Sequence, residues 1–314
     1  MISLILAAAL AAQPAPAADE ILSVAGPHGL LQGAFLSGGT GSPTVIIVPG
    51  SGPTDRDGNN PLGVKAGSYK ALAGALAVRG VTTLRIDKRG MFGSRPAIPD
   101  ANKVTIADYA SDVHRWAAAA RQKTHARCVW VAGHSEGGVV ALAAAQNRTD
   151  ICGVITLSAP GRPIGPVMRE QFRDNPANAP ILAPALAAID ALEKGGSVDV
   201  TTLPAPLKAV FNPAVQPFMR DLMRQDPAGL AHALKVPLLI VQGDQDLQVK
   251  VADAQLLHQA QPKSAILIVP NMNHVLKTVP RDDAAANFAA YGNPSLPIAP
   301  GLADAIAQFV KRHR

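Results

Sequence analysis

The sequence predicts an α/β protein, with a mostly parallel β-sheet covered by helices and an inserted helical cap. Short apolar runs rich in β-branched residues alternate with longer helical patterns, which is typical of a parallel sheet. The alternation stops at Gly161 and resumes at Val236, and prolines punctuate the segment between them. With 314 residues, 48% of them hydrophobic and 17% charged, the chain is long enough for one large domain with such an insertion.

Residues 1–17 have the pattern of a secretory signal peptide. Residues 2–12 are apolar but too few to span a bilayer, and residues 15–17, Ala-Pro-Ala, have the small-x-small form of a cleavage site. We therefore expect an exported protein, periplasmic or secreted; a mis-assigned start or an amphiphilic tail is the alternative. No later run in the sequence is apolar for long enough to span a membrane, so no stable membrane insertion is expected.

The first part of the sheet domain is predicted over 18–160. Residues 21–25 and 30–36 flank Pro-His-Gly at 27–29, which indicates a hairpin. The elements that follow alternate regularly: strand 44–48, helix 66–79, strand 82–86, helix 105–121, strand 128–132, helix 138–146 and strand 153–157.

The cap is predicted over 161–235 and the second part of the sheet domain over 236–314. Within the cap, 181–193 and 217–224 are amphipathic. After it, the sequence predicts strand 236–241, helix 251–260, strand 265–269, a proline-rich loop over 278–300 and a last helix over 301–311. Because ligands of such sheets bind at the carboxyl ends of strands, the loops that follow strands are the places to search for chemistry.

A nucleophile is predicted at Ser135, in the sequence Gly-His-Ser-Glu-Gly-Gly at 133–138. A buried strand precedes this motif and a helix follows it, which is the setting of a nucleophile elbow. The sharp turn forces the serine into a strained conformation, and the glycines on either side leave room for the chain.

A serine hydroxyl needs a base and an acid that orients the base, and two later strand ends supply them. His274 follows the strand that ends at residue 269, and Asp246 follows the strand that ends at residue 241. The order Ser135, Asp246, His274 is the one expected on an α/β-hydrolase sheet. Asp244 is the competing acid and is better interpreted as shaping the loop. Next to the nucleophile, His134 is expected to point away from the reaction.

The loop after strand 44–48 is predicted to complete an oxyanion hole. We assign one donor to the backbone N–H of Glu136 and the other to Ser51, with Gly52 as the fallback; an ordinary Gly/Pro turn is the alternative. Further along this loop, Arg56 could bind a polar substrate end or lock the loop through ion pairs. The charged residues at 87–90 are interpreted as structural bracing.

The two cysteines and the net charge bear on environment and partners. If the strands that begin at Cys128 and Cys152 are neighbours, the sulfurs could form a disulfide; two buried thiols are the alternative. Neither cysteine has a metal-ligand spacing, so no metal site is expected. The formal charge of +6 is dispersed, with no basic block among aromatics, so no nucleic-acid partner is expected.

Taken together, these motifs resemble those of the α/β-hydrolase superfamily of serine hydrolases over nearly the whole mature chain. More narrowly, the segments 49–58, 87–90, 133–138 and 241–249 resemble a bacterial group of carboxylesterases that includes the EstD-type esterases. The resemblance implies an acyl-enzyme esterase with a helical cap and no cofactor. The sequence differs from many relatives in having Met91 and Phe92 where they continue Val-Gly or His-Gly.

The predicted function is hydrolysis of small carboxylic esters with short to medium acyl chains by Ser135, His274 and Asp246. A peptidase, amidase or thioesterase with the same triad is the alternative, because the fold does not fix the leaving group. A non-catalytic binding protein on this fold is a further hypothesis, and it would predict the loss of at least one triad residue. The oligomeric state and the physiological substrate are left open.

Overall fold

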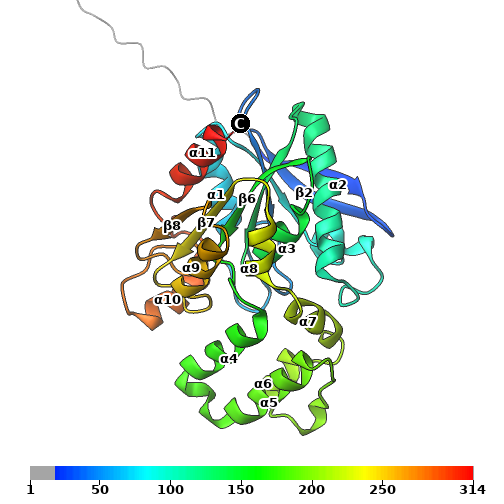
Figure 1. Ribbon diagram of the computed structural model, residues 1–314, viewed down its shortest axis with the longest axis vertical. Coiled ribbons are helices and arrows are strands. Elements are labelled where there is room, and N and C mark those ends of the chain that lie inside the picture. The colour runs from blue at the N-terminus through cyan, green and yellow to red at the C-terminus, as the bar shows by residue number, and fades with distance from the viewer. Residues whose placement is uncertain (1–17, 314) are drawn as a thin grey trace, which may run out of the picture.

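The computed structural model describes residues 18–313, and the predicted signal peptide at 1–17 lies outside them (Figure 1). Its centre is an eight-stranded sheet in the order β1-β2-β4-β3-β5-β6-β7-β8. Strand β2 pairs antiparallel with β1 and β4, and all other neighbours run parallel. The strands are β1 Glu20–Ala25, β2 Leu30–Leu36, β3 Thr44–Val48, β4 Thr82–Ile86, β5 Val129–His134, β6 Ile151–Leu157, β7 Leu238–Gly243 and β8 Ala265–Val269.

Helices cover both faces of the sheet, because successive side chains of the buried strands enter two different cores. Val45 and Ile47 of β3 pack with α1 and α11, whereas Ile46 and Val48 pack with the helices of the other face. The predicted α/β class, a mostly parallel sheet covered by helices, is confirmed. The helices of the sheet domain are α1 Ser68–Ala77 and α11 Leu302–Arg312 on one face, and α2 Ile106–Thr124, α3 Glu136–Ala144, α8 Pro227–Ala233 and α9 Val251–Ala260 on the other.

The inserted cap lies below the sheet in Figure 1 and has an apolar core of its own. Ile189 and Phe211 are two of the fully buried side chains in that core. Helix α8, at the end of the insertion, packs instead on α9 and α3 of the sheet domain. The cap elements are α4 Ile164–Asp174, η2 Pro176–Ile181, α5 Leu182–Glu193, η3 Val200–Thr202, α6 Ala205–Val210 and α7 Gln216–Met223.

Buried or half-buried polar contacts tie the cap to the sheet domain at both of its ends. At the first end, Arg162 forms a salt bridge with the buried Asp253 (3.0 Å), which also accepts a hydrogen bond from the Gly161 N–H. At the other end, the Asp221 carboxylate of α7 accepts a hydrogen bond (2.7 Å) from the Ile106 N–H at the start of α2. These contacts therefore fix the position of the cap relative to the sheet domain.

Outside the segment 161–235, the structure contains two elements that the sequence did not predict. The segment 278–300 was expected to be a loop throughout, but it contains helix α10 (Ala284–Tyr291), so that prediction is wrong. The Asp283 side chain caps this helix by accepting from the Ala286 N–H (2.9 Å), and alanines favour the helical turns that follow. A short 3-10 helix, η1 (Phe92–Ala97), was also not predicted. No helix in the described part of the chain is both long and apolar enough to cross a membrane.

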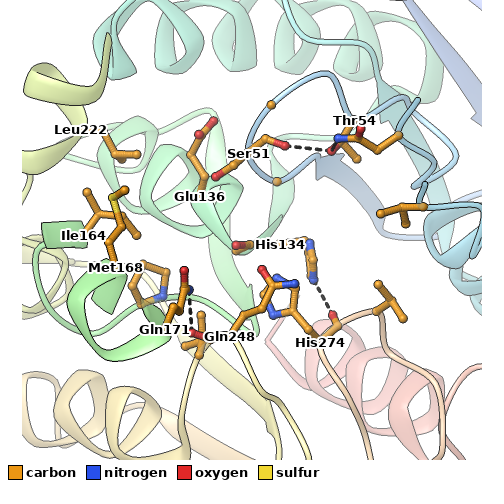
Figure 2. Close-up of a pocket in the computed structure, with 18 of the residues that line it drawn as sticks. Ser51, Thr54, His134, Glu136, Ile164, Met168, Gln171, Leu222, Gln248 and His274 are labelled. Atoms are coloured by element: carbon orange, nitrogen blue, oxygen red, sulfur yellow. Dashed lines mark hydrogen bonds between the residues drawn. The ribbon is translucent and has the colours of Figure 1, made fainter. Parts of the chain in front are cut away.

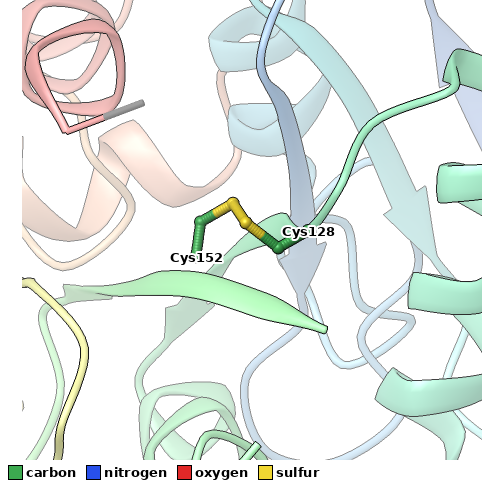
Figure 3. Close-up of a disulfide and its surroundings, with 2 residues drawn as sticks. All are labelled: Cys128 and Cys152. Carbon is green, nitrogen blue, oxygen red and sulfur yellow. A yellow bond between two sulfur atoms is a disulfide. The ribbon is translucent and has the colours of Figure 1, made fainter. Parts of the chain in front are cut away.

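Cys128 and Cys152 form a disulfide at the beginning of two neighbouring strands (Figure 3). Cys128 directly precedes β5 and Cys152 lies in β6, which pairs parallel with β5. An irregularity in the register leaves Cys152 without a ladder partner, and the two Cα atoms are 5.2 Å apart. Of the two states that the sequence left open, the structure has the paired one.

Removing the disulfide is expected to lower the free energy of unfolding by about 2–4 kcal/mol, because the bond restricts the unfolded chain. The two cysteines are 24 residues apart, so the loop that the bond closes is long enough for an effect of this size. Urea unfolding of the wild type with and without reductant measures the difference. The double variant Cys128→Ala, Cys152→Ala is the control, since reductant should not change its midpoint; a wild-type midpoint that is insensitive to complete reduction would contradict the prediction.

Candidate active site

Ser135 lies on a sharp turn between β5 and α3. Its backbone has φ 53° and ψ −123°, a combination that is strained for a residue with a side chain. The Ser135 N–H donates to the Leu157 carbonyl of β6 (2.9 Å), which fixes the turn to the sheet. Glycine is required on both sides: a Cβ on Gly133 would collide with the Gly137 carbonyl, and a Cβ on Gly137 would collide with the Val48 carbonyl.

His274 and Asp246 are paired in the loops after β8 and β7. Their side chains are almost fully buried, and His274 Nδ1 lies 2.8 Å from Asp246 Oδ2. The other carboxylate oxygen of Asp246 accepts from the N–H groups of Gln248 (2.8 Å) and Val249 (2.9 Å), and Gln242 Nε2 donates to Oδ2 (3.1 Å). The carboxylate can therefore orient the imidazole.

The pKa of Asp246 is set by opposing effects. Burial disfavours the carboxylate, but the charge of His274 and the hydrogen bonds from His274, Val249 and Gln248 outweigh burial and hold the pKa of the carboxyl below its ordinary value. Asp246 is therefore ionised at neutral pH. An ionised carboxylate beside Nδ1 is what a histidine needs in order to become a cation during a reaction.

Asp244, the competing acid, has other partners. Its carboxylate accepts from the Asn271 N–H (2.6 Å) and forms a salt bridge with Arg281 (2.6 Å). Since Asn271 begins the loop that carries His274, these contacts shape that loop. The structure thus brings Asp246, and not Asp244, into contact with the imidazole.

Ser135 and His274 line one cavity of about 490 Å³ between the carboxyl ends of the strands and the cap. In the described chain, no hydrogen bond joins the Ser135 hydroxyl to His274, although both residues line the cavity. Figure 2 shows the two sides of this cavity, with apolar cap side chains on one side and the loop after β3 on the other. The apolar cap residues include Ile164, Met168, Val215, Phe218, Met219, Leu222 and Met223.

The loop after β3 reaches the cavity through the residues predicted to complete an oxyanion hole. Ser51, Gly52 and Glu136 all line the cavity. The Thr54 hydroxyl donates to the Ser51 carbonyl (2.9 Å), which braces the turn, as Figure 2 shows. The Gly50 N–H is already used, because it donates to the Tyr69 hydroxyl (3.2 Å). The use of its N–H excludes Gly50 as a donor, and the assignment to Ser51 and Glu136, with Gly52 as the fallback, stays a prediction.

Arg56 is directed away from the cavity. Its guanidinium forms a salt bridge with Asp87 (2.6 Å), and its N–H donates to the same carboxylate (2.9 Å). Of the two roles considered for Arg56, these contacts correspond to locking of the loop.

The charged residues of the segment 87–90 brace the site through ion pairs and hydrogen bonds. Lys88 is buried, and its ammonium donates to the Gly50 carbonyl (2.7 Å) and to Glu136 Oε1 (2.9 Å). It therefore joins the loop after β3 to the residue that follows Ser135. Arg89 pairs with the buried Asp112 (2.7 Å) on α2.

Three residues at the site were missed or undervalued by the sequence analysis. Tyr69 belongs to no motif, and His134 was set aside because it cannot reach the reacting atoms. Gln248 accepts a hydrogen bond from Gln171 of the cap at its backbone carbonyl (2.8 Å) and donates to the Tyr291 hydroxyl (2.9 Å). His134 lies beside Ser135 and Gln248 lies within the segment 241–249, so these two gave a signal in the sequence, whereas Tyr69 gave none.

Comparisons with known proteins agree with this architecture. The model of the alpha/beta hydrolase family matches residues 45–291. Esterase EstD of Thermotoga maritima is 28% identical over 244 residues, which cover 74% of this chain and 54% of that protein. This chain thus spans about half the length of that relative.

Solved structures agree in fold. The Pyrococcus furiosus esterase Pf2001 superposes with a TM-score of 0.59 at 15% identity, covering 94% of this chain and 93% of that one. Est1E from Butyrivibrio proteoclasticus gives a TM-score of 0.57 at 16% identity, covering 93% and 98%. At these identities the similarity establishes the arrangement of the elements.

Proposed function

Because the chain belongs to the alpha/beta hydrolase family, we propose that it is a serine carboxylesterase acting through Ser135, His274 and Asp246. The observation that carries the proposal is the arrangement at the cavity. A serine on a strained turn faces the same space as a histidine that is paired with a buried carboxylate. The similarity to esterase EstD and to several structurally similar esterases supports the reaction class.

The proposed reaction has two stages. His274 Nε2 takes the proton of Ser135 as Oγ bonds to the ester carbonyl carbon, and Asp246 stabilises the imidazolium through Nδ1. The tetrahedral intermediate then expels the alcohol, which receives that proton, and leaves an acyl group on Ser135. In the second stage water, deprotonated by His274, attacks the acyl-enzyme and releases the acid, and the proton returns to Ser135.

Negative charge on the carbonyl oxygen is stabilised in both stages. We assign this role to the N–H groups of Ser51 and Glu136, each of which would be worth about 2.7–4 kcal/mol in the transition state. Glu136 is the first residue of α3, so the partial positive charge of the helix N-terminus acts in the same direction.

The lining of the cavity supports an uncharged substrate with an apolar acyl group. Among the described residues that line it, Glu136 is the only one with a carboxylate, and that carboxylate forms a salt bridge with Lys88. The cap side is aliphatic, aromatic and rich in methionine, a side chain that adapts to ligands of different shape. A cavity of about 490 Å³ is in the range of small-molecule sites, which favours short to medium acyl chains.

A substrate panel tests the proposal. We expect kcat/KM to be highest for p-nitrophenyl butyrate or octanoate and to fall at least about 10-fold for palmitate, because the cavity cannot enclose a long chain. Aminoacyl p-nitroanilides should be poor substrates, since the described lining has no unpaired carboxylate to bind their ammonium group. A preference for the anilides would favour a peptidase, and a maximum at palmitate would contradict the proposed chain length.

We also propose that the protein works outside the cytoplasm. The disulfide between Cys128 and Cys152 supports this location, because such bonds form and persist in oxidising compartments. The apolar segment at 2–12 supports it independently. Fractionation of cells that express the complete chain, with N-terminal sequencing of the product, tests both the location and the predicted cleavage after residue 17.

A further inference from the structure

A buried chain of three hydrogen bonds connects the loop after β3 to the segment that carries His274. The Gly50 N–H donates to the Tyr69 hydroxyl (3.2 Å), which lies 2.8 Å from His134 Nδ1. His134 Nε2 in turn lies 2.8 Å from the His274 carbonyl oxygen, the contact drawn between the two labelled histidines in Figure 2. Tyr69 and His134 are only 3% and 6% exposed, and both line the cavity.

The donor and the acceptor of each of these three hydrogen bonds follow from the groups at the two ends of the series. A carbonyl oxygen can only accept, so His134 Nε2 must carry a proton. Burial, and secondarily the charge of the nearby His274, lower the pKa of His134 to about 3, so the ring is neutral and Nδ1 has a lone pair. The Tyr69 hydroxyl must then donate to Nδ1, and its oxygen is free to accept from Gly50. Burial also raises the pKa of Tyr69, which keeps that proton in place.

Both ends of the chain lie against the reacting groups. A Cβ placed on Gly50 would be 3.2 Å from the Cβ of Ser135, and the next residue, Ser51, supplies a proposed oxyanion donor. At the other end, the His134 ring packs on the ring of His274, with centroids 4.7 Å apart. A shift of either segment would therefore break a hydrogen bond between largely buried groups, which is costly.

We propose that Tyr69 and His134 are positioning residues that hold the oxyanion-hole loop and the His274 segment at a fixed separation on either side of Ser135. This inference rests on the proposed esterase function, but it concerns residues that take no part in the proposed proton transfer, although both line the cavity. Their contribution is made in the transition state, where the oxyanion donor and the imidazole must both be in place.

The test is Tyr69→Phe, which keeps the ring and removes the hydroxyl that joins the two halves of the chain. We expect kcat to fall about 10-fold and KM to stay within about twofold of the wild type, since a transition-state contact is weakened and substrate binding is not. Tyr109→Phe is the matched control. It removes another buried phenol hydroxyl, but in the described structure Tyr109 makes no hydrogen bond to either segment, so its kcat should stay near the wild-type value.

A second measurement does not depend on activity. Nitrogen-15 NMR of the wild-type histidine rings should find His134, assigned from its absence in His134→Asn, protonated at Nε2 and unprotonated at Nδ1 from pH 5 to 9. An Nδ1–H tautomer would overturn the inference, as would an unchanged kcat in folded Tyr69→Phe. A wild type that hydrolyses no ester would instead overturn the proposed function, and the tautomer would still test the buried chain.

Discussion

Replacing Ser135 with alanine is expected to lower kcat for p-nitrophenyl butyrate by about 10⁵-fold or more. The methyl group of alanine cannot form an acyl-enzyme, so hydrolysis would depend on direct attack by water. The proposed oxyanion donors and the cavity stay in place in this variant, and they account for a residual rate above that in water. A rate of this size must be measured with protein free of contaminating hydrolases, and the comparison is with wild type purified in the same way.

The control for this variant is Ser197→Ala. Ser197 is exposed in the cap and does not line the cavity, so its replacement should leave kcat within about twofold of the wild type. The wild type and this control should also react with a fluorophosphonate, whereas Ser135→Ala should not. Ser135 would be excluded as the nucleophile if Ser135→Ala hydrolysed the ester at the wild-type rate. It would also be excluded if the folded wild type did not react with the fluorophosphonate.

Ser135 could be proposed as the nucleophile from sequence because the constraint on it is local. The turn needs glycine at two fixed positions, and the buried strand and the helix that flank it directly precede and follow it in the sequence. His274 and Asp246 are far from Ser135 along the chain, yet a parallel sheet gathers the carboxyl ends of its strands at one edge. The order of the strands was therefore enough to predict that the three residues gather at this edge of the sheet.

The partners of Tyr69 and Lys88 could not be predicted in this way. Each side chain contacts a backbone group of the loop after β3 as well as one other side chain, and a backbone partner leaves no pattern in the sequence. The contacts of His134 could not be predicted for a related reason. The sequence predicts that its side chain points away from the reaction, and in the structure that direction takes it to Tyr69 and to the His274 carbonyl.

The cap shows a different limit. Its prolines and amphipathic segments predicted that the regular alternation would stop, and the structure contains helices there. Which of their side chains would face the cavity depends on how the cap packs on the sheet, and that is fixed by long-range contacts such as Arg162 with Asp253 and Asp221 with Ile106. For this reason, the sequence could not predict which apolar side chains of the cap line the cavity.

Replacing Asp246 with asparagine is expected to lower kcat by about 10⁴-fold. The variant side chain has nearly the same shape, but only one of its two terminal atoms can accept a hydrogen bond. The N–H groups of Gln248 and Val249 both point at one carboxylate oxygen, so the amide oxygen of the variant must face them. The NH₂ group then faces His274, where the carboxylate accepted from Nδ1.

This arrangement forces His274 into the wrong tautomer. An NH₂ group donates, so Nδ1 of His274 must offer its lone pair and the ring proton must move to Nε2. An Nε2 that already carries a proton cannot take one from Ser135, and no carboxylate is left to stabilise an imidazolium. KM should change much less than kcat, because Asp246 lies behind the imidazole and does not line the cavity.

Asp244→Asn is the matched control, because it makes the same substitution two residues earlier in the same loop. Asp244 contacts Asn271 and Arg281 and not the imidazole, so its replacement should loosen the loop and lower kcat by about 10-fold at most. The ratio between the two variants separates the orienting acid from the residue that shapes the loop. If Asp244→Asn lost as much activity as is expected of Asp246→Asn while Asp246→Asn stayed active, the acid of the triad would be Asp244.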